Sequence, residues 1–142
     1  MMQAIEAIPA LNRILGILSR SLPTYLADAK PWRAMNGSDV YSAIQRLAAD
    51  QHRYARRVAD AIVRLGGQPT QSHFPSAFAA KNDLSVDFLL RDVLEWQEQD
   101  IDLIARCAAE LDGMSSLHAL AEEVLGNAKG HRDILRQLAK RE

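Results

Sequence analysis

Five polar side chains of this sequence fall in helical stripes that are otherwise apolar, and each can both donate and accept a hydrogen bond. They are Tyr25, Gln51, Tyr54, Gln97 and His131. Gln51 and Tyr54 lie three residues apart, so they share one face of a helix. A buried polar group without a partner costs about 1–3 kcal/mol. We therefore expect the five to be bonded to one another or to trapped water, as a central hydrogen-bond network.

Three interpretations of this polar centre remain open from the residue types alone. The network could fix the register of packed helices, line a small-molecule pocket as in a ligand carrier, or be the remainder of a metal site. Local motifs for other chemistry are missing: the sequence contains no glycine-rich phosphate loop, no Cys-x-x-Cys pair and no His-Glu-x-x-His run.

Four long helices must position this centre, and apolar residues at steps of three and four predict them. In the second helix, Val58 and Ile62 continue the apolar stripe and Gly66 ends it. Pro23 lies inside the first helix and predicts a bend near residues 19–23. The predicted helices cover residues 3–29, 39–65, 84–111 and 115–140.

The connections between these helices predict the topology. Residues 30–37 form a connector after the first helix. Residues 67–83, with a helical turn at 76–80, are longer than most links between bundle helices, which have roughly 2–8 residues. Such a long connection returns the chain along the bundle, so the second and third helices should run parallel. The sequence predicts a single all-α domain over residues 1–142, an up-down four-helix bundle with a long crossover between helices two and three.

Composition restricts the class of protein and its partners. The 142 residues are 48% hydrophobic and 25% charged, with a net charge of −1. No global field attracts nucleic acid, and the basic end of the fourth helix is explained by the helix dipole, so we do not expect a nucleic-acid partner. No apolar run is long enough to predict a membrane span. Cys107 is the single cysteine, which fits a reducing compartment and favours the cytoplasm.

The chain resembles the ferritin-like superfamily, with bacterioferritins and rubrerythrins as the nearest models. On the first helix the resemblance rests on Leu11-Asn12, Leu15-Gly16 and Tyr25. On the second it rests on the run VADAIVRLGGQP, and on the fourth on His131-Arg132-Asp133-Ile134-Leu135 followed by Gln137-Leu138. The resemblance covers all four helices and implies the ferritin-like fold.

Iron-handling members of the superfamily place a glutamate on each of two helices and a Glu-x-x-His pair on each of the other two. The resemblance implies that these six ligand positions are occupied here by Leu18, Gln51, Tyr54, Gln97, Ala128 and His131. If the register of the third helix differs by a step, Glu95 or Glu98 replaces Gln97. Only His131 retains the residue type of the family, so we expect a degenerate di-iron centre and no cofactor.

Two classes of function follow from the resemblance. The first is a non-catalytic structural or partner-binding bundle, whose protein partner the sequence does not identify. Since the chain ends soon after the fourth helix, without the short fifth helix of many cage-forming relatives, we expect a homodimer. The second is an iron-binding protein or ferroxidase with non-standard ligands. Its candidate ligands are Glu95, Glu98 and His131, with Asp50 or His52. Whether the protein is an enzyme stays open.

Overall fold

A computed structural model of the chain describes residues 4–29, 39–78 and 86–141. The described residues form helices and connections, with no β-strand among them, and the predicted all-α class is confirmed. Two short helices in line make up the first rod of the bundle, and three long helices make up the others. In chain order they are α1 (Ala4–Ser19), α2 (Leu22–Ala29), α3 (Asp39–Arg64), α4 (Val86–Glu110) and α5 (Ser115–Lys140).

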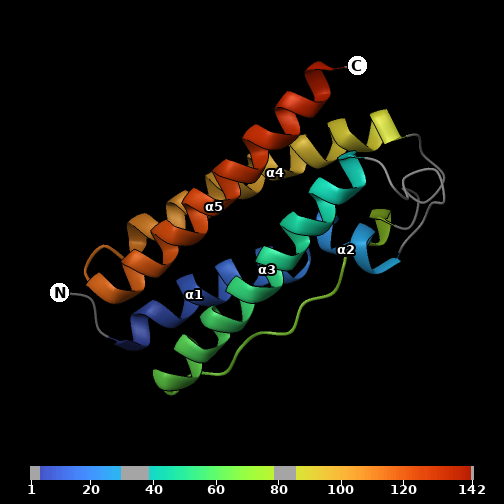
Figure 1. The fold of residues 1–142 in the computed structure, drawn as a ribbon. Helices are drawn as coiled ribbons and strands as arrows, with labels where there is room; N and C mark the ends of the chain where they lie inside the picture. The colour runs from blue at the N-terminus through green and yellow to red at the C-terminus, as the bar shows by residue number, and fades with distance from the viewer. Residues whose placement is uncertain (1–3, 30–38, 79–85, 142) are drawn as a thin grey trace.

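The rods pack as a four-membered bundle. Helix α1 contacts α3 and α4, and α5 contacts the same two helices. Figure 1 shows α3 and α4 running in one direction, while α1 and α5 run in the other. The predicted parallel course of the second and third long helices is therefore confirmed. Within the described part of the chain, no helix is long and apolar enough to cross a membrane.

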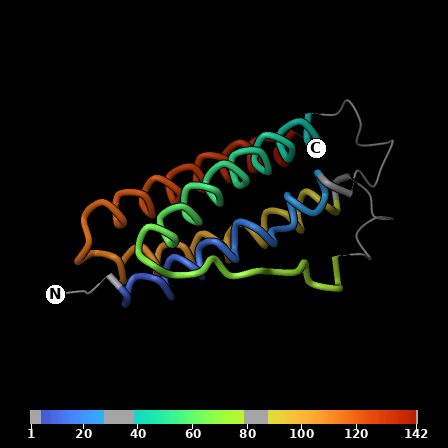
Figure 2. Tube along the Cα trace, turned by 90° about the horizontal axis from the view of Figure 1, so that it is seen from below, coloured from blue at the N-terminus to red at the C-terminus, as the bar shows by residue number. Residues whose placement is uncertain are grey.

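The crossover after α3 runs back along the bundle beside α1 (Figure 2). Asn12 of α1 fixes its course: the side-chain amide donates to the Gln68 carbonyl at 3.2 Å, and its oxygen accepts from the Thr70 N–H at 2.8 Å. A single 3₁₀ turn at residues 76–78 follows, closed by the Phe78 N–H on the Pro75 carbonyl at 3.0 Å. The predicted turn at 76–80 is present as far as 78. The rest of it, and the predicted connector, lie outside the described residues.

Helix α3 ends where the glycine pair predicted its end. Gly66 has a φ of +86°, a left-handed conformation that glycine adopts without a side-chain clash. The Gly67 N–H then donates to the Ile62 carbonyl at 2.9 Å, which satisfies a carbonyl left over at the helix end. A Cβ on Gly67 would lie 2.8 Å from a methyl of Ile8, so the chain leaves α3 in close contact with α1.

The first rod is broken rather than bent. Ser21 lies between α1 and α2, and its hydroxyl oxygen accepts from the Thr24 N–H at 3.1 Å, as an N-cap does. Pro23 is then the second residue of a new helix, where its missing N–H costs no intrahelical bond. The bend predicted at 19–23 is a complete restart of the helix.

Two hydrophobic clusters fill the bundle. One joins α1 to the later halves of α3 and α4 and the first part of α5, and the other joins α2 to the earlier halves of α3 and α4 and the last part of α5. Four buried polar residues lie along the chain where one cluster gives way to the other. They are Ser21, Thr24, Gln51 and Gln97, each at most 4% exposed. The interior therefore has a polar layer between two apolar halves.

Ser21→Ala removes both the cap of α2 and a buried hydroxyl. We expect a loss of about 1–3 kcal/mol in the free energy of unfolding, measured by urea denaturation, because a helix cap and a buried hydrogen bond are lost together. Ser21→Thr keeps the hydroxyl and serves as the control. An equal loss in both variants would show that the hydroxyl is not what matters at this position.

Candidate functional site

The polar layer begins with Gln51 of α3. Its side-chain oxygen accepts a hydrogen bond of 2.6 Å from the Ser21 hydroxyl and one of 3.2 Å from the Thr24 hydroxyl. The two hydroxyl oxygens are themselves 3.0 Å apart. Both donors come from the break in the first rod, so the restart of the helix at α2 delivers them to the middle of the bundle. The carbonyl of a fully buried amide is thus saturated by protein groups.

Gln97 of α4 is satisfied on one side only. Its side-chain nitrogen donates to the backbone carbonyl of Ala128 on α5 at 3.1 Å. Its side-chain oxygen is buried and has no hydrogen-bond partner among the described residues. The small side chain at position 128 leaves the α5 backbone open to this contact. An orphaned carbonyl of this kind costs about 1–3 kcal/mol.

His131 faces α3 and not the centre of the bundle. Its Nε2 lies 2.7 Å from Oδ2 of Asp50, and the Asn127 amide donates to the same oxygen at 2.8 Å. Arg53 lies 3.1 Å from the other oxygen. Burial by itself raises the pKa of Asp50, but the hydrogen bonds from Asn127 and His131 and the nearby positive charges outweigh it, so the pKa is lowered. Asp50 and His131 therefore join α3 to α5 through an anionic carboxylate.

The two tyrosines of the predicted network have separate surroundings. The buried ring of Tyr54 lies beside the guanidinium groups of Arg53 and Arg57, 5.3 and 5.4 Å from its centroid. Burial and a hydrogen bond with Glu123 raise the pKa of Tyr54.

Tyr25 packs in an aromatic group on the other side of the break. Its ring meets Phe74 of the crossover edge to face at 5.3 Å, and Phe78 lies 5.7 Å away. Tyr25 therefore packs the crossover against α2.

The structure connects three members of the predicted network to other residues, and the single network stays a prediction. Gln51, Gln97 and His131 form hydrogen bonds with residues outside the predicted set of five. Sequence reasoning missed Ser21 and Thr24, the partners of Gln51. The signal was present as Ser21-Leu22-Pro23-Thr24, a capping serine with proline in the first turn. Treating residues 3–29 as one continuous helix concealed it.

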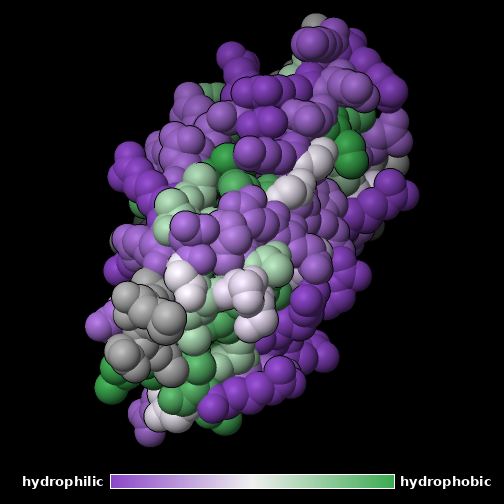
Figure 3. All heavy atoms as spheres, turned by 90° about the vertical axis from the view of Figure 1, so that its left-hand side faces the viewer, coloured by the Kyte–Doolittle hydropathy of each residue, from purple (hydrophilic) through white to green (hydrophobic). Residues whose placement is uncertain are grey.

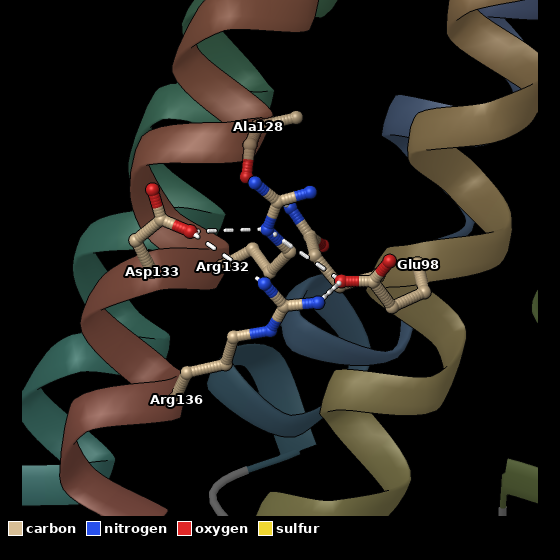
Figure 4. Close-up of polar contacts among 6 residues, drawn as sticks. Glu98, Ala128, Arg132, Asp133 and Arg136 are labelled. Atoms are coloured by element: carbon tan, nitrogen blue, oxygen red, sulfur yellow. Dashed lines mark hydrogen bonds and ion pairs between the residues drawn. The ribbon is translucent and has the colours of Figure 1, made fainter.

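The alternative metal ligands are engaged elsewhere or exposed. Glu98 of α4 binds Arg136 at 2.7 Å and lies 3.5 Å from Arg132, and Figure 4 shows both arginines reaching it from α5. Glu95 and His52 are exposed. In residues 4–29, 39–78 and 86–141, no three histidine, cysteine or acidic side chains are grouped so that they could hold a metal ion.

Comparison with solved structures identifies the fold. A bacterioferritin of Desulfovibrio desulfuricans superposes with a TM-score of 0.79 at 15% sequence identity, over 96% of this chain and 80% of that chain. Its X-ray structure describes a diiron site in different catalytic states. No protein-family model and no curated protein matches the sequence. The chain has the ferritin-like fold, as the resemblance in sequence implied.

The two buried glutamines should respond in opposite ways to replacement by leucine. Gln51→Leu leaves two buried hydroxyls without their acceptor, so we expect a loss of about 1–3 kcal/mol in the free energy of unfolding. Gln97→Leu removes an orphaned carbonyl at similar volume, and we expect little change or a gain in stability. Urea denaturation of the two variants measures the contrast. Equal losses would show that the orphaned oxygen of Gln97 has no energetic cost.

Proposed function

We propose that this protein is a ferritin-like bundle with a degenerate di-iron centre, which acts without metal as a structural or partner-binding module. The proposal rests on the side-chain oxygen of Gln51, which already accepts two hydrogen bonds from the protein. At a position where an iron-handling relative needs a carboxylate, this chain has a neutral amide whose oxygen is already occupied by two protein hydroxyls. The side chain is committed to holding α3 against the break in the first rod.

The residues at the other implied ligand positions do not fit iron either. Two iron ions need several anionic oxygen ligands to balance their charge. Leu18 and Ala128 are buried and have no donor atom in their side chains. Gln97 offers a single neutral oxygen, and His131 is engaged by Asp50. We therefore derive no iron chemistry for the bundle centre.

We further propose that the protein forms a homodimer in the cytoplasm. A free, buried cysteine fits a reducing compartment. At the end of the bundle where α1 begins, the surface has hydrophilic regions and hydrophobic atoms that gather low in the view of Figure 3. Ile5 is 74% and Val63 is 59% exposed near this end, where α1 begins and α3 ends. Pairing of two copies through such side chains would remove them from water.

Ferrous iron is expected not to stabilise the protein. A ligand that binds the folded state raises the melting temperature, so an anaerobic titration with ferrous iron, followed by the melting temperature, reads out binding directly. We expect no shift in the melting temperature. Metal analysis of the purified protein should find no stoichiometric iron. A clear upward shift, or about one iron or more per chain, contradicts the proposal.

A restored variant makes the titration decisive. Leu18→Glu, Gln51→Glu, Tyr54→His, Gln97→Glu and Ala128→Glu together rebuild the ligand set that the resemblance implies. We expect this variant to be unstable without metal, since four carboxylates are then buried together, and to gain a large rise in melting temperature with ferrous iron. If the restored variant folds and its melting temperature does not change with ferrous iron, these six positions do not correspond to the family's ligands.

The dimer is tested by sedimentation velocity. We expect a mass of twice the 15.8 kDa of one chain. Ile5→Glu with Val63→Glu should give the monomer, because two charges cannot be buried in the interface. Ile134→Glu on α5, where the native side chain is 50% exposed, is the matched control. A monomer at all concentrations, or an unaffected dimer in the double variant, contradicts the proposed interface.

A further inference from the structure

The seam between α1 and α4 contains a groove that touches the polar layer at Ser21. Its main cavity has a volume of 330 Å³. A smaller recess of 100 Å³ lies next to it under Pro75 of the crossover, and the two share Ile17, Arg20 and Leu103 in their walls. Ligand pockets in proteins begin at roughly 300 Å³, so the groove has room for a small molecule.

The lining of the groove is apolar at its base. Ile17 of α1 and Cys107 of α4 are 5% and 3% exposed and form the closed side. Leu103, one turn before Cys107 on α4, is 43% exposed although its helix packs against α1. A hydrocarbon chain laid over Leu103 would remove this apolar surface from water.

The charges around the groove are unequal. Arg13 is engaged by Glu110, with which it forms an ion pair, and by the sulfur of Cys107. Arg20 and Arg106 also line the main cavity, and neither forms an ion pair with any residue in the described ranges. Two guanidinium groups without a direct ion pair among the described residues, beside an apolar base, are complementary to a molecule with an anionic head and an apolar body.

Asp100 lies in the smaller recess, where its own charge acts on Arg20. Burial raises its pKa to about 7, even though the positive charge of Arg20 acts to lower it. Arg20 is the one charged side chain that lines the recess with it among the described residues. In the main cavity the charged or titratable groups are Arg13, Arg20, Arg106, Cys107 and Glu110.

We propose that the groove between α1 and α4 binds a small amphipathic carboxylate, with its acyl chain on Ile17 and Leu103 and its head group at Arg20 and Arg106. The carboxylate offers both arginines a direct ion-pair partner, and the chain covers the exposed leucine. This site lies outside the bundle centre, so it does not depend on the proposed loss of iron binding.

Octanoate is the probe for this site, and isothermal titration calorimetry of the full chain measures its affinity. We expect octanoate to bind at least roughly tenfold more tightly than octan-1-ol, because a charge-assisted hydrogen bond is worth about that factor. Arg20→Gln and Arg106→Gln should each weaken octanoate binding by a similar factor. Arg46→Gln removes the same charge from an exposed position on α3, outside the groove, and should have no effect.

The acidity of Asp100 gives the test a second readout. Octanoate is ionised at both about pH 6 and about pH 8, while Asp100 is mostly neutral at the lower value and mostly anionic at the higher. An anionic Asp100 repels the ligand and competes for Arg20, so binding should weaken roughly fivefold between these pH values. Asp100→Asn should bind equally well at both.

The proposal is overturned by any of three results. The first is no binding of octanoate at millimolar concentration. The second is equal affinity for octanoate and octan-1-ol, which would mean that the arginines do not recognise the head group. The third is unchanged octanoate affinity in Arg20→Gln and Arg106→Gln, which would place the ligand elsewhere. Melting curves of the four variants, compared with the native chain, establish that each is folded.

Discussion

The carbonyl oxygen of Gln51 can be buried in the middle of the bundle because two hydroxyl groups reach it from the break between α1 and α2. That contact imposes conditions on several elements at once. Ser21 must leave helical geometry to cap α2, and Thr24 must lie one turn further on. Helix α3 must hold its register so that Gln51, and not a neighbouring residue, meets the break. Much of the course of the first rod follows from the need to satisfy one amide.

The rest of the interior divides around this layer. Apolar residues pack on both sides of it, in one cluster that contains α1 and another that contains α2. Gln97 of α4 forms a single hydrogen bond with a backbone carbonyl of α5, which connects these two helices. Its side-chain oxygen is left without a partner among the described residues. The charged residues that could serve a reactive centre lie at the edges of the bundle. Asp50 and His131 join α3 to α5, and Glu98 joins α4 to two arginines of α5.

The sequence predicted the long elements well because their signals are local and repeated. The stripe of α3 and the glycines after it predicted a helix over residues 39–65, and the structure has Asp39–Arg64. The length of the crossover alone predicted the parallel course of α3 and α4. Such features depend on periodicity and chain length, which a single sequence displays directly.

The partners of the buried polar groups could not be predicted in the same way. A helical wheel places His131 on a seam, but its imidazole turns toward Asp50, a residue that flanks the seam of another helix. Whether Gln51 meets Tyr25 or Ser21 depends on a restart of the helix that changes the rotation of every residue after it. Side-chain direction across helices is a property of the packed bundle, and periodicity along one helix does not contain it.

The break between α1 and α2 also divides the molecule along its length. The backbone hydrogen bonds of the two helices form separate ladders, so α2 can come apart without unwinding α1. The cluster around α2 is distinct from the one around α1, and only the polar layer stands between them. Separate packing of this kind is what allows one part of a protein to open before another in native-state hydrogen exchange. The half that contains α2, Phe78 and the start of α4 could then fluctuate while the other half keeps the groove between α1 and α4 closed at its base.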